Sequence, residues 1–387
     1  MRAPSRGPTA STLGAAASAC AVGLALVPTA SAHGGSVHGG TPHWTLFATF
    51  LVGLGVVAAS ALLGRTGRID RPRLVVVGVL GGLLLATLPA IGLTELQAEP
   101  LGTDATPIPR VWYPVLTLVT GTVVLLASVL LGVWRWEGRP AYAALGSLLG
   151  LWVLYPLLVP GSGEYWHPLG YLLVGCLPVL VGYVVWRDVR PALRGIDPAS
   201  RRIGGLVASL FTVFLLFSTG QFTLNPEQGM GVPDESFLVV TRFANPLVTW
   251  PAVEFYARSV PLFGALSVGT ALTFALLAGL VGINASLTAA VWRRDVPVDG
   301  GSGVLGGVAT TGATTCCCCA PAFYGVASAA LGLSTSPLYW VFLDPASPIG
   351  TLFFVGATAL LVGSAIRLSA ALAGAGVCDL DRARPSR

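Results

Sequence analysis

The chain has 387 residues, of which 54% are apolar and only 10% are charged. This composition excludes an ordinary soluble domain, because such a share of apolar residues is typical of integral membrane proteins. The lipid bilayer is therefore the first partner that the sequence implies.

The first apolar segment is typical of a secretory signal peptide. Arg2 and Arg6 precede an apolar stretch at 13–27, and the small residues at 30–32 come just before His33. A basic start, an apolar centre and a small-residue site are the three parts of such a signal. Residues 1–32 are therefore predicted to be a signal peptide, and whether it is cleaved stays open.

Nine further apolar runs follow, and each is long enough to cross a membrane core of about 30 Å as a helix. They cover about 43–64, 73–95, 111–134, 141–160, 168–186, 203–223, 259–292, 303–333 and 350–373. The predicted fold class is all-α, a polytopic transmembrane helix bundle of about nine spans.

The runs divide the chain into three parts after the signal. Residues 33–302 form a seven-span region, 303–373 a two-span region with the cysteines, and 374–387 a cytoplasmic tail. The longest break is an outer loop at about 224–258. Its segment 243–256 mixes aromatic residues with prolines, which favours a loop anchored at the membrane interface over a cover for the outer mouth.

The distribution of arginine predicts the orientation, because the chain has no lysine. After the predicted signal peptide, 17 arginines fall in one alternating set of breaks between the apolar runs, and three fall in the other set. The positive-inside rule assigns the rich set to the cytoplasm. A signal before residue 33 puts the mature N-terminus outside, and nine crossings bring the C-terminus inside. This orientation agrees with the arginine distribution.

The predicted localisation is the cell membrane, as a multi-pass protein. The net charge of +5 reflects this topology, so no nucleic-acid partner is implied.

Ionisable residues fall near span ends or in the breaks. All four histidines are predicted to lie outside, which removes axial ligands for an embedded haem, so no haem is predicted. Because no histidine is predicted within a span, a proton relay through the membrane is also a weaker interpretation. Asn284 and Gln221 lie within spans, where such residues more often join helices than bind ligands.

Four consecutive cysteines, Cys316, Cys317, Cys318 and Cys319, lie midway along an apolar run and are followed by Ala320 and Pro321. Successive helical residues are rotated by about 100°, so only Cys316 and Cys319 approach each other, one turn apart. Pro321 disfavours a continuous helix, which predicts a kink or break at the block. A broken helix at membrane depth is tolerated where it is buried in protein or lines a cavity.

Thiolates bind soft metals and exchange electrons. A pair of them can hold Cu(I) or another soft ion in low coordination. The bound ion then carries little net charge, which reduces the penalty of crossing hydrocarbon. Binding releases protons, so the affinity depends on pH.

Three segments, Thr314–Pro321, Ala330–Leu333 and Phe342–Pro345, together resemble the mercuric-ion transport proteins of the inner membrane. In that family a Thr-Cys-Cys-x-x-Pro helix is followed by an Ala-Leu-Gly stretch, an acidic-Pro turn and a second helix. The resemblance covers about 303–373. It implies that Cys317 and Cys318 receive a soft metal ion, Hg(II) in the family, from the outer side. Pro321, Asp344 and Pro345 take the family's structural positions, whereas its second cysteine pair has no counterpart here.

A second set of metal ligands is suggested by the predicted mature start, which contains His33, His38 and His43. A free amine and imidazole rings can bind copper or zinc outside. The alternative is a flexible Gly/His-rich leader with no ligand role. The ligand interpretation implies an extracytoplasmic metal donor as a partner.

Three interpretations of the cysteine block therefore stay open. The first is movement or handling of a thiophilic ion, Hg(II) or Cu(I), as substrate. The second is a membrane thiol–disulfide oxidoreductase that uses Cys316 and Cys319 and passes electrons to a quinone. The third treats the cysteines as small packing residues in a structural or partner-binding subunit. The sequence favours the first, a role that is not enzymatic.

Overall fold

The computed structural model describes residues 37–38, 41–65, 72–94, 108–136, 138–159, 166–224, 235–244, 246–260, 262–294 and 347–382. Within these ranges the chain is mostly helical, and seven helices are long and apolar enough to cross a membrane. Helices occupy eight of the nine predicted runs. The ninth run, 303–333, and the predicted signal peptide lie outside the described residues.

The chain divides into two compact units. The first contains a short antiparallel ladder of β1 (Val37–His38) and β2 (Thr41–Pro42), followed by helices α2 (His43–Arg65) and α3 (Pro72–Thr94). Glycines allow the two helices to approach closely. A Cβ on Gly82 would lie 2.8 Å from the carbonyl oxygen of Gly53, and a Cβ on Gly78 would meet the side chain of Ser60. Small residues at helix contacts are typical of membrane bundles.

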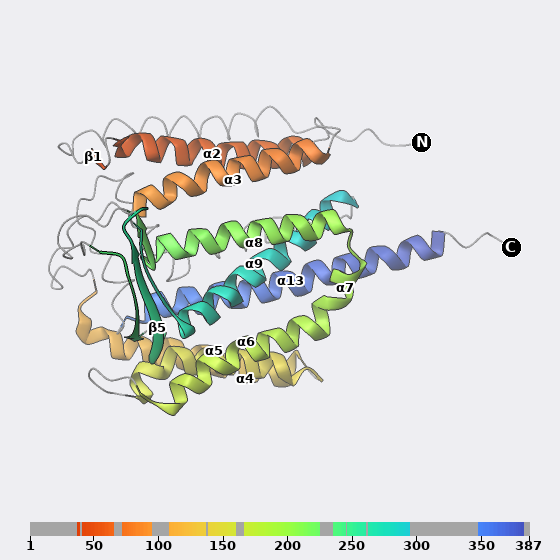
Figure 1. Ribbon diagram of the computed structural model, residues 1–387. Coiled ribbons are helices and arrows are strands. Elements are labelled where there is room, and N and C mark those ends of the chain that lie inside the picture. Colours follow the sequence, from red (N-terminus) through yellow and green to blue (C-terminus); the bar gives the residue numbers. More distant parts are fainter. Residues whose placement is uncertain are drawn as a thin grey trace. The chain divides into compact units, whose positions relative to one another are not determined.

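The second unit contains the remaining helices, which run alongside one another (Figure 1). They are η3 (Arg110–Trp112), α4 (Tyr113–Trp134), α5 (Pro140–Leu158), α6 (Pro168–Val184), the π-helical turn η4 (Val185–Val189), α7 (Arg190–Gly195), α8 (Pro198–Ser218), α9 (Val268–Arg293) and α13 (Pro348–Arg382). Proline starts α5, α6 and α8, where its missing N–H costs nothing because the first helical N–H has no partner.

The core of the second unit lies along α9 and α13. Leu277 and Leu287 of α9 and Leu361 of α13 are fully buried. One cluster joins residues of η4, α9 and α13, including Val189, Leu287 and Ala365. By contrast, α4 exposes a row of leucines and valines along its length. In a membrane protein such a face contacts lipid, because lipid tails are as apolar as leucine.

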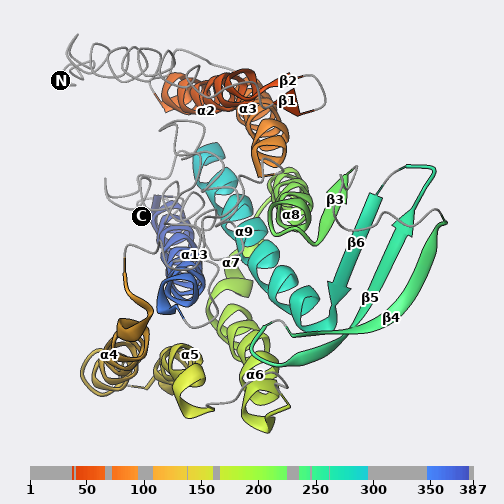
Figure 2. The same ribbon diagram turned by 90° about the vertical axis from the view of Figure 1, so that its left-hand side faces the viewer.

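A four-stranded antiparallel sheet lies between α8 and α9 in the sequence. Its strands are β3 (Phe222–Leu224), β4 (Phe237–Ala244), β5 (Thr249–Ala257) and β6 (Leu262–Ser267), in the order β3-β6-β5-β4 (Figure 2). Within the expected loop at 224–258, the described residues form strands of this sheet, which corrects the loop prediction there. The all-α class therefore holds for the apolar helices only. The predicted runs 203–223 and 259–292 also extended into β3 and β6. Hydropathy does not separate a strand from a span when both are apolar.

The helix that starts at Pro168 is longer than the predicted run at 168–186. It continues through η4 and α7 to Gly195. A π turn adds one residue within a helix, and such turns often occur at functional positions. Here the turn carries Asp188, whose backbone oxygen accepts a hydrogen bond from Ser369 of α13 at 3.0 Å.

Candidate functional site

Most residues that the sequence assigns to a metal site lie outside the described residues. These are Cys316, Cys317, Cys318, Cys319, Pro321, Asp344, Pro345 and His33. His38 lies in β1, where it pairs with Thr41, and His43 is the first residue of α2. Within the described ranges no three His, Cys, Asp or Glu side chains form a group that could hold a metal ion. The metal site therefore stays a prediction.

The helices on either side of the cysteine block in the sequence, α9 and α13, contact each other directly. Asn284 of α9 is fully buried, and its Nδ2 donates to the carbonyl oxygens of Leu280 at 2.8 Å and Leu361 at 3.0 Å. The bond to Leu361 crosses from α9 to α13. The expectation that Asn284 joins helices is thus confirmed.

Two buried oxygens on α9 have no hydrogen-bond partner in the described part of the chain. Asn284 Oδ1 is buried and accepts no hydrogen bond, and Thr288 Oγ1 is in the same state. The two residues are one helical turn apart and therefore lie on one face of α9. Buried polar atoms are almost always satisfied, by protein or by water. The pair can therefore accept hydrogen bonds from water, although hard oxygens are poor ligands for a soft metal.

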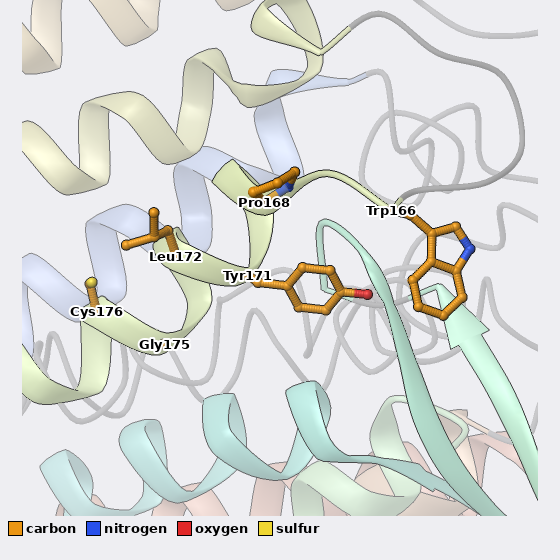
Figure 3. Close-up of a pocket in the computed structure, with 6 residues that line it drawn as sticks. All are labelled: Trp166, Pro168, Tyr171, Leu172, Gly175 and Cys176. Atoms are coloured by element: carbon orange, nitrogen blue, oxygen red, sulfur yellow. The ribbon is translucent and has the colours of Figure 1, made fainter.

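A pocket of about 610 Å³ opens at the start of α6, near the sheet (Figure 3). Pro168, Leu172 and Cys176 follow one face of the helix at intervals of four residues, while Tyr171 and Trp166 extend toward the sheet. The thiol of Cys176 is free and exposed. The lining offers one sulfur and mostly apolar surface, which suits an apolar group and lacks the several donors of a metal site.

The sheet is fixed to the helices by the turn before β5. Val248 is fully buried, and the Tyr171 hydroxyl donates to the carbonyl oxygen of Thr249 at 2.6 Å. The rings of Tyr171 and Trp250 meet edge to face, with centroids 4.9 Å apart. A Cβ on Gly269, at the start of α9, would lie 2.6 Å from Cδ1 of Trp250. The sheet is therefore packed against the ends of both α6 and α9.

A polar cluster lies at the opposite ends of the helices. Arg139 Nη1 donates to the Tyr142 hydroxyl at 2.9 Å, and that hydroxyl donates to Asp188 Oδ2 at 2.8 Å. The hydrogen bond and the electrostatic interaction with Tyr142 raise the pKa of Arg139 most, and the nearby Asp188 charge adds to this. Together with the bond from Ser369, this cluster joins the start of α5, η4 and α13. These contacts hold the three elements together at this end of the second unit.

Asp197 caps α8 at the same end. Its carboxylate accepts from Ser200 Oγ at 2.7 Å and from Ser200 N at 3.2 Å, and Arg293 Nη1 donates to it at 2.7 Å. The hydroxyl of Ser200 contributes most to a lowered pKa of Asp197, and its backbone N–H and Arg293 add to it. Sequence reasoning assigned no role to Asp197, although an Asp-Pro pair ahead of an apolar run is typical of a helix start.

No family model, curated protein or solved structure matches this chain. The resemblance of 303–373 to mercuric-ion transport proteins therefore stays a prediction from a short motif.

Proposed function

We propose that the protein spans the cell membrane many times, with the sheet outside and the mature N-terminus on the same side. The support is the arginine distribution. The turn between α4 and α5, the segment from η4 to α8 and the end of α9 are rich in arginine and lie at the end of the second unit opposite the sheet (Figure 1). This arginine-rich end is assigned to the cytoplasm by the positive-inside rule, and the C-terminus with it.

The proposed function is the movement or handling of a thiophilic metal ion, Hg(II) or Cu(I), as substrate. The observation that carries it is the block of four cysteines followed by Ala320 and Pro321, in the stretch between α9 and α13. Four adjacent sulfurs in an apolar setting suit a soft cation better than any hard ion. The resemblance to mercuric-ion transport proteins points to Cys317 and Cys318 as the receiving pair.

In the proposed mechanism, His33, His38 and His43 first capture the ion outside, delivered by an extracytoplasmic donor. Two thiols of the block then lose their protons and hold the ion as a thiolate pair. The complex carries little net charge, which lowers the cost of holding it within the membrane. The proposal assigns to Pro321 the predicted bend at the block and to Asp344 and Pro345 the predicted turn after it.

Titration of the purified protein with Hg(II), Ag(I) and Cu(I) tests this proposal. We expect stoichiometric binding with proton release in the wild type and none when Cys316 to Cys319 are replaced by serine. Cys176→Ser is the matched control, because this thiol is exposed on α6 and lies apart from the block in the sequence. Loss of metal binding in Cys176→Ser, with binding kept when Cys316 to Cys319 are serine, contradicts the proposal.

Counting free thiols before and after reduction separates the remaining interpretations. A reducible disulfide that reacts with a quinone and depends on Cys316 and Cys319 favours the oxidoreductase. A serine variant that folds normally, with neither metal binding nor a disulfide in the wild type, favours a structural or partner-binding subunit. Either outcome overturns metal handling.

A further inference from the structure

A groove of about 420 Å³ lies between α7, α8 and α9 at the arginine-rich end of the second unit. Arg194 of α7 and Arg201 of α8 line one part of it. The remaining lining is small or apolar, apart from Ser286, and includes Gly205, Ala208 and Gly279. The groove is thus basic at one end and apolar along the rest.

The shape of the groove follows from its glycines. Gly204 and Gly282 let α8 and α9 cross with their backbones in contact, since a Cβ on Gly282 would lie 2.9 Å from the carbonyl oxygen of Gly204. Next to this crossing, a Cβ on Gly205 or Gly279 would meet nothing within 4 Å. Both of these glycines are exposed on helices that are apolar enough to span a membrane. The groove is therefore open on the outer surface of α8 and α9, the surface that contacts lipid in the proposed membrane arrangement.

The two arginines are available to bind an anion. The described residues contain two ion pairs, Arg139 with Asp188 and Arg293 with Asp197, and neither uses Arg194 or Arg201. Arg201 Nη2 donates to the carbonyl oxygens of Arg194 at 2.8 Å and Ile196 at 3.2 Å. These bonds orient the guanidinium and engage one of its nitrogens, while the group offers five N–H donors in all.

We propose that this groove binds one anionic phospholipid. Its phosphate lies against Arg194 and Arg201, and an acyl chain lies along Gly205, Ala208 and Gly279. Arginine binds phosphate through paired, charge-assisted hydrogen bonds. Basic pockets between helices on the cytoplasmic side of a membrane are typical sites for anionic headgroups. A free anion would use only the basic end, whereas an amphiphile fills the whole groove.

The proposal predicts selective lipid retention. Purified protein is equilibrated with mixed micelles or nanodiscs that contain phosphatidylcholine alone or with phosphatidylglycerol, and bound lipid is counted by native mass spectrometry. We expect one phosphatidylglycerol per chain. Replacing both arginines, R194Q with R201Q, removes two charge-assisted contacts and should weaken retention at least about tenfold. Gly279→Leu or Gly205→Leu fills the apolar part and should have a similar effect, although neither changes a charge.

Arg202→Gln is the matched control, because Arg202 is exposed on α8 beside Arg201 and does not line the groove. It should retain the lipid. Equal binding of both lipids, or equal loss in the control, overturns the proposal. Competition by inorganic phosphate, together with normal binding in both leucine variants, would identify a site for a free anion instead. Unchanged melting temperatures show that each variant is folded.

Discussion

Gly282 provides a direct test of how α8 and α9 pack. A Cβ at this position would lie 2.8 Å from Cβ of Ala208 and 2.9 Å from the carbonyl oxygen of Gly204. Neither neighbour is the end of a flexible side chain, so the helices themselves must separate. Gly279 lies three residues earlier on the same helix, and a Cβ there would meet nothing within 4 Å. A glycine-to-alanine change therefore meets close contacts at position 282 and open space at position 279.

The expected free energies follow from these contacts. Alanine stabilises a helix relative to glycine by roughly 0.5–1 kcal/mol, so Gly279→Ala should gain about that amount. Overpacking costs about 1–3 kcal/mol, so Gly282→Ala should lose up to about 2.5 kcal/mol after the same gain is subtracted. Equilibrium unfolding in mixed micelles, followed by tryptophan fluorescence, measures both. Equal stabilities for the two variants would refute the close backbone contact.

Two further predictions concern opposite ends of the second unit. Tyr171→Phe removes the hydrogen bond to Thr249 and should cost about 0.5–1.5 kcal/mol, with faster amide exchange in β5; unchanged exchange would show that this bond does not hold the sheet. The pKa of Asp197 is lowered by Ser200 and Arg293. Its stabilisation is therefore complete above the unfolded pKa of about 3.9 and is lost as the pH falls through the lower folded pKa. Melting temperatures from pH 6 to pH 3 should fall more for the wild type than for Asp197→Asn, and parallel curves would contradict this role.

The membrane helices were largely predictable, because hydropathy and proline mark their bodies and starts. Pro140 and Pro168 begin helices within one residue of the predicted runs. The start of α8 was missed by five residues, because Arg201 and Arg202 interrupt the apolar pattern although the helix begins at Pro198. Charge at a membrane surface ends an apolar run without ending a helix.

The sheet was not predicted, for two reasons. The residues of β3 and β6 are apolar and were mostly included in predicted spans, whereas prolines and single charges within and between β4 and β5 made that segment resemble a loop. The segment 237–244 is rich in valine and phenylalanine, and Asn245 and Pro246 follow it at a turn. These were the available signals for a hairpin. The contacts that fix the sheet, such as Tyr171 to Thr249, join residues 78 positions apart and leave no local pattern. The cysteine block is clear in the sequence, but its geometry stays a prediction.

The junction between β6 and α9 has a mechanical consequence. Ser267 is the last residue of β6 and also caps α9, with its Oγ accepting from Thr270 N at 3.0 Å. No linker separates strand from helix, so a tilt of the sheet must tilt the first turn of α9 as well. Among the described spans α9 is the most buried, so the sheet is joined without a hinge to the helix at the centre of the second unit.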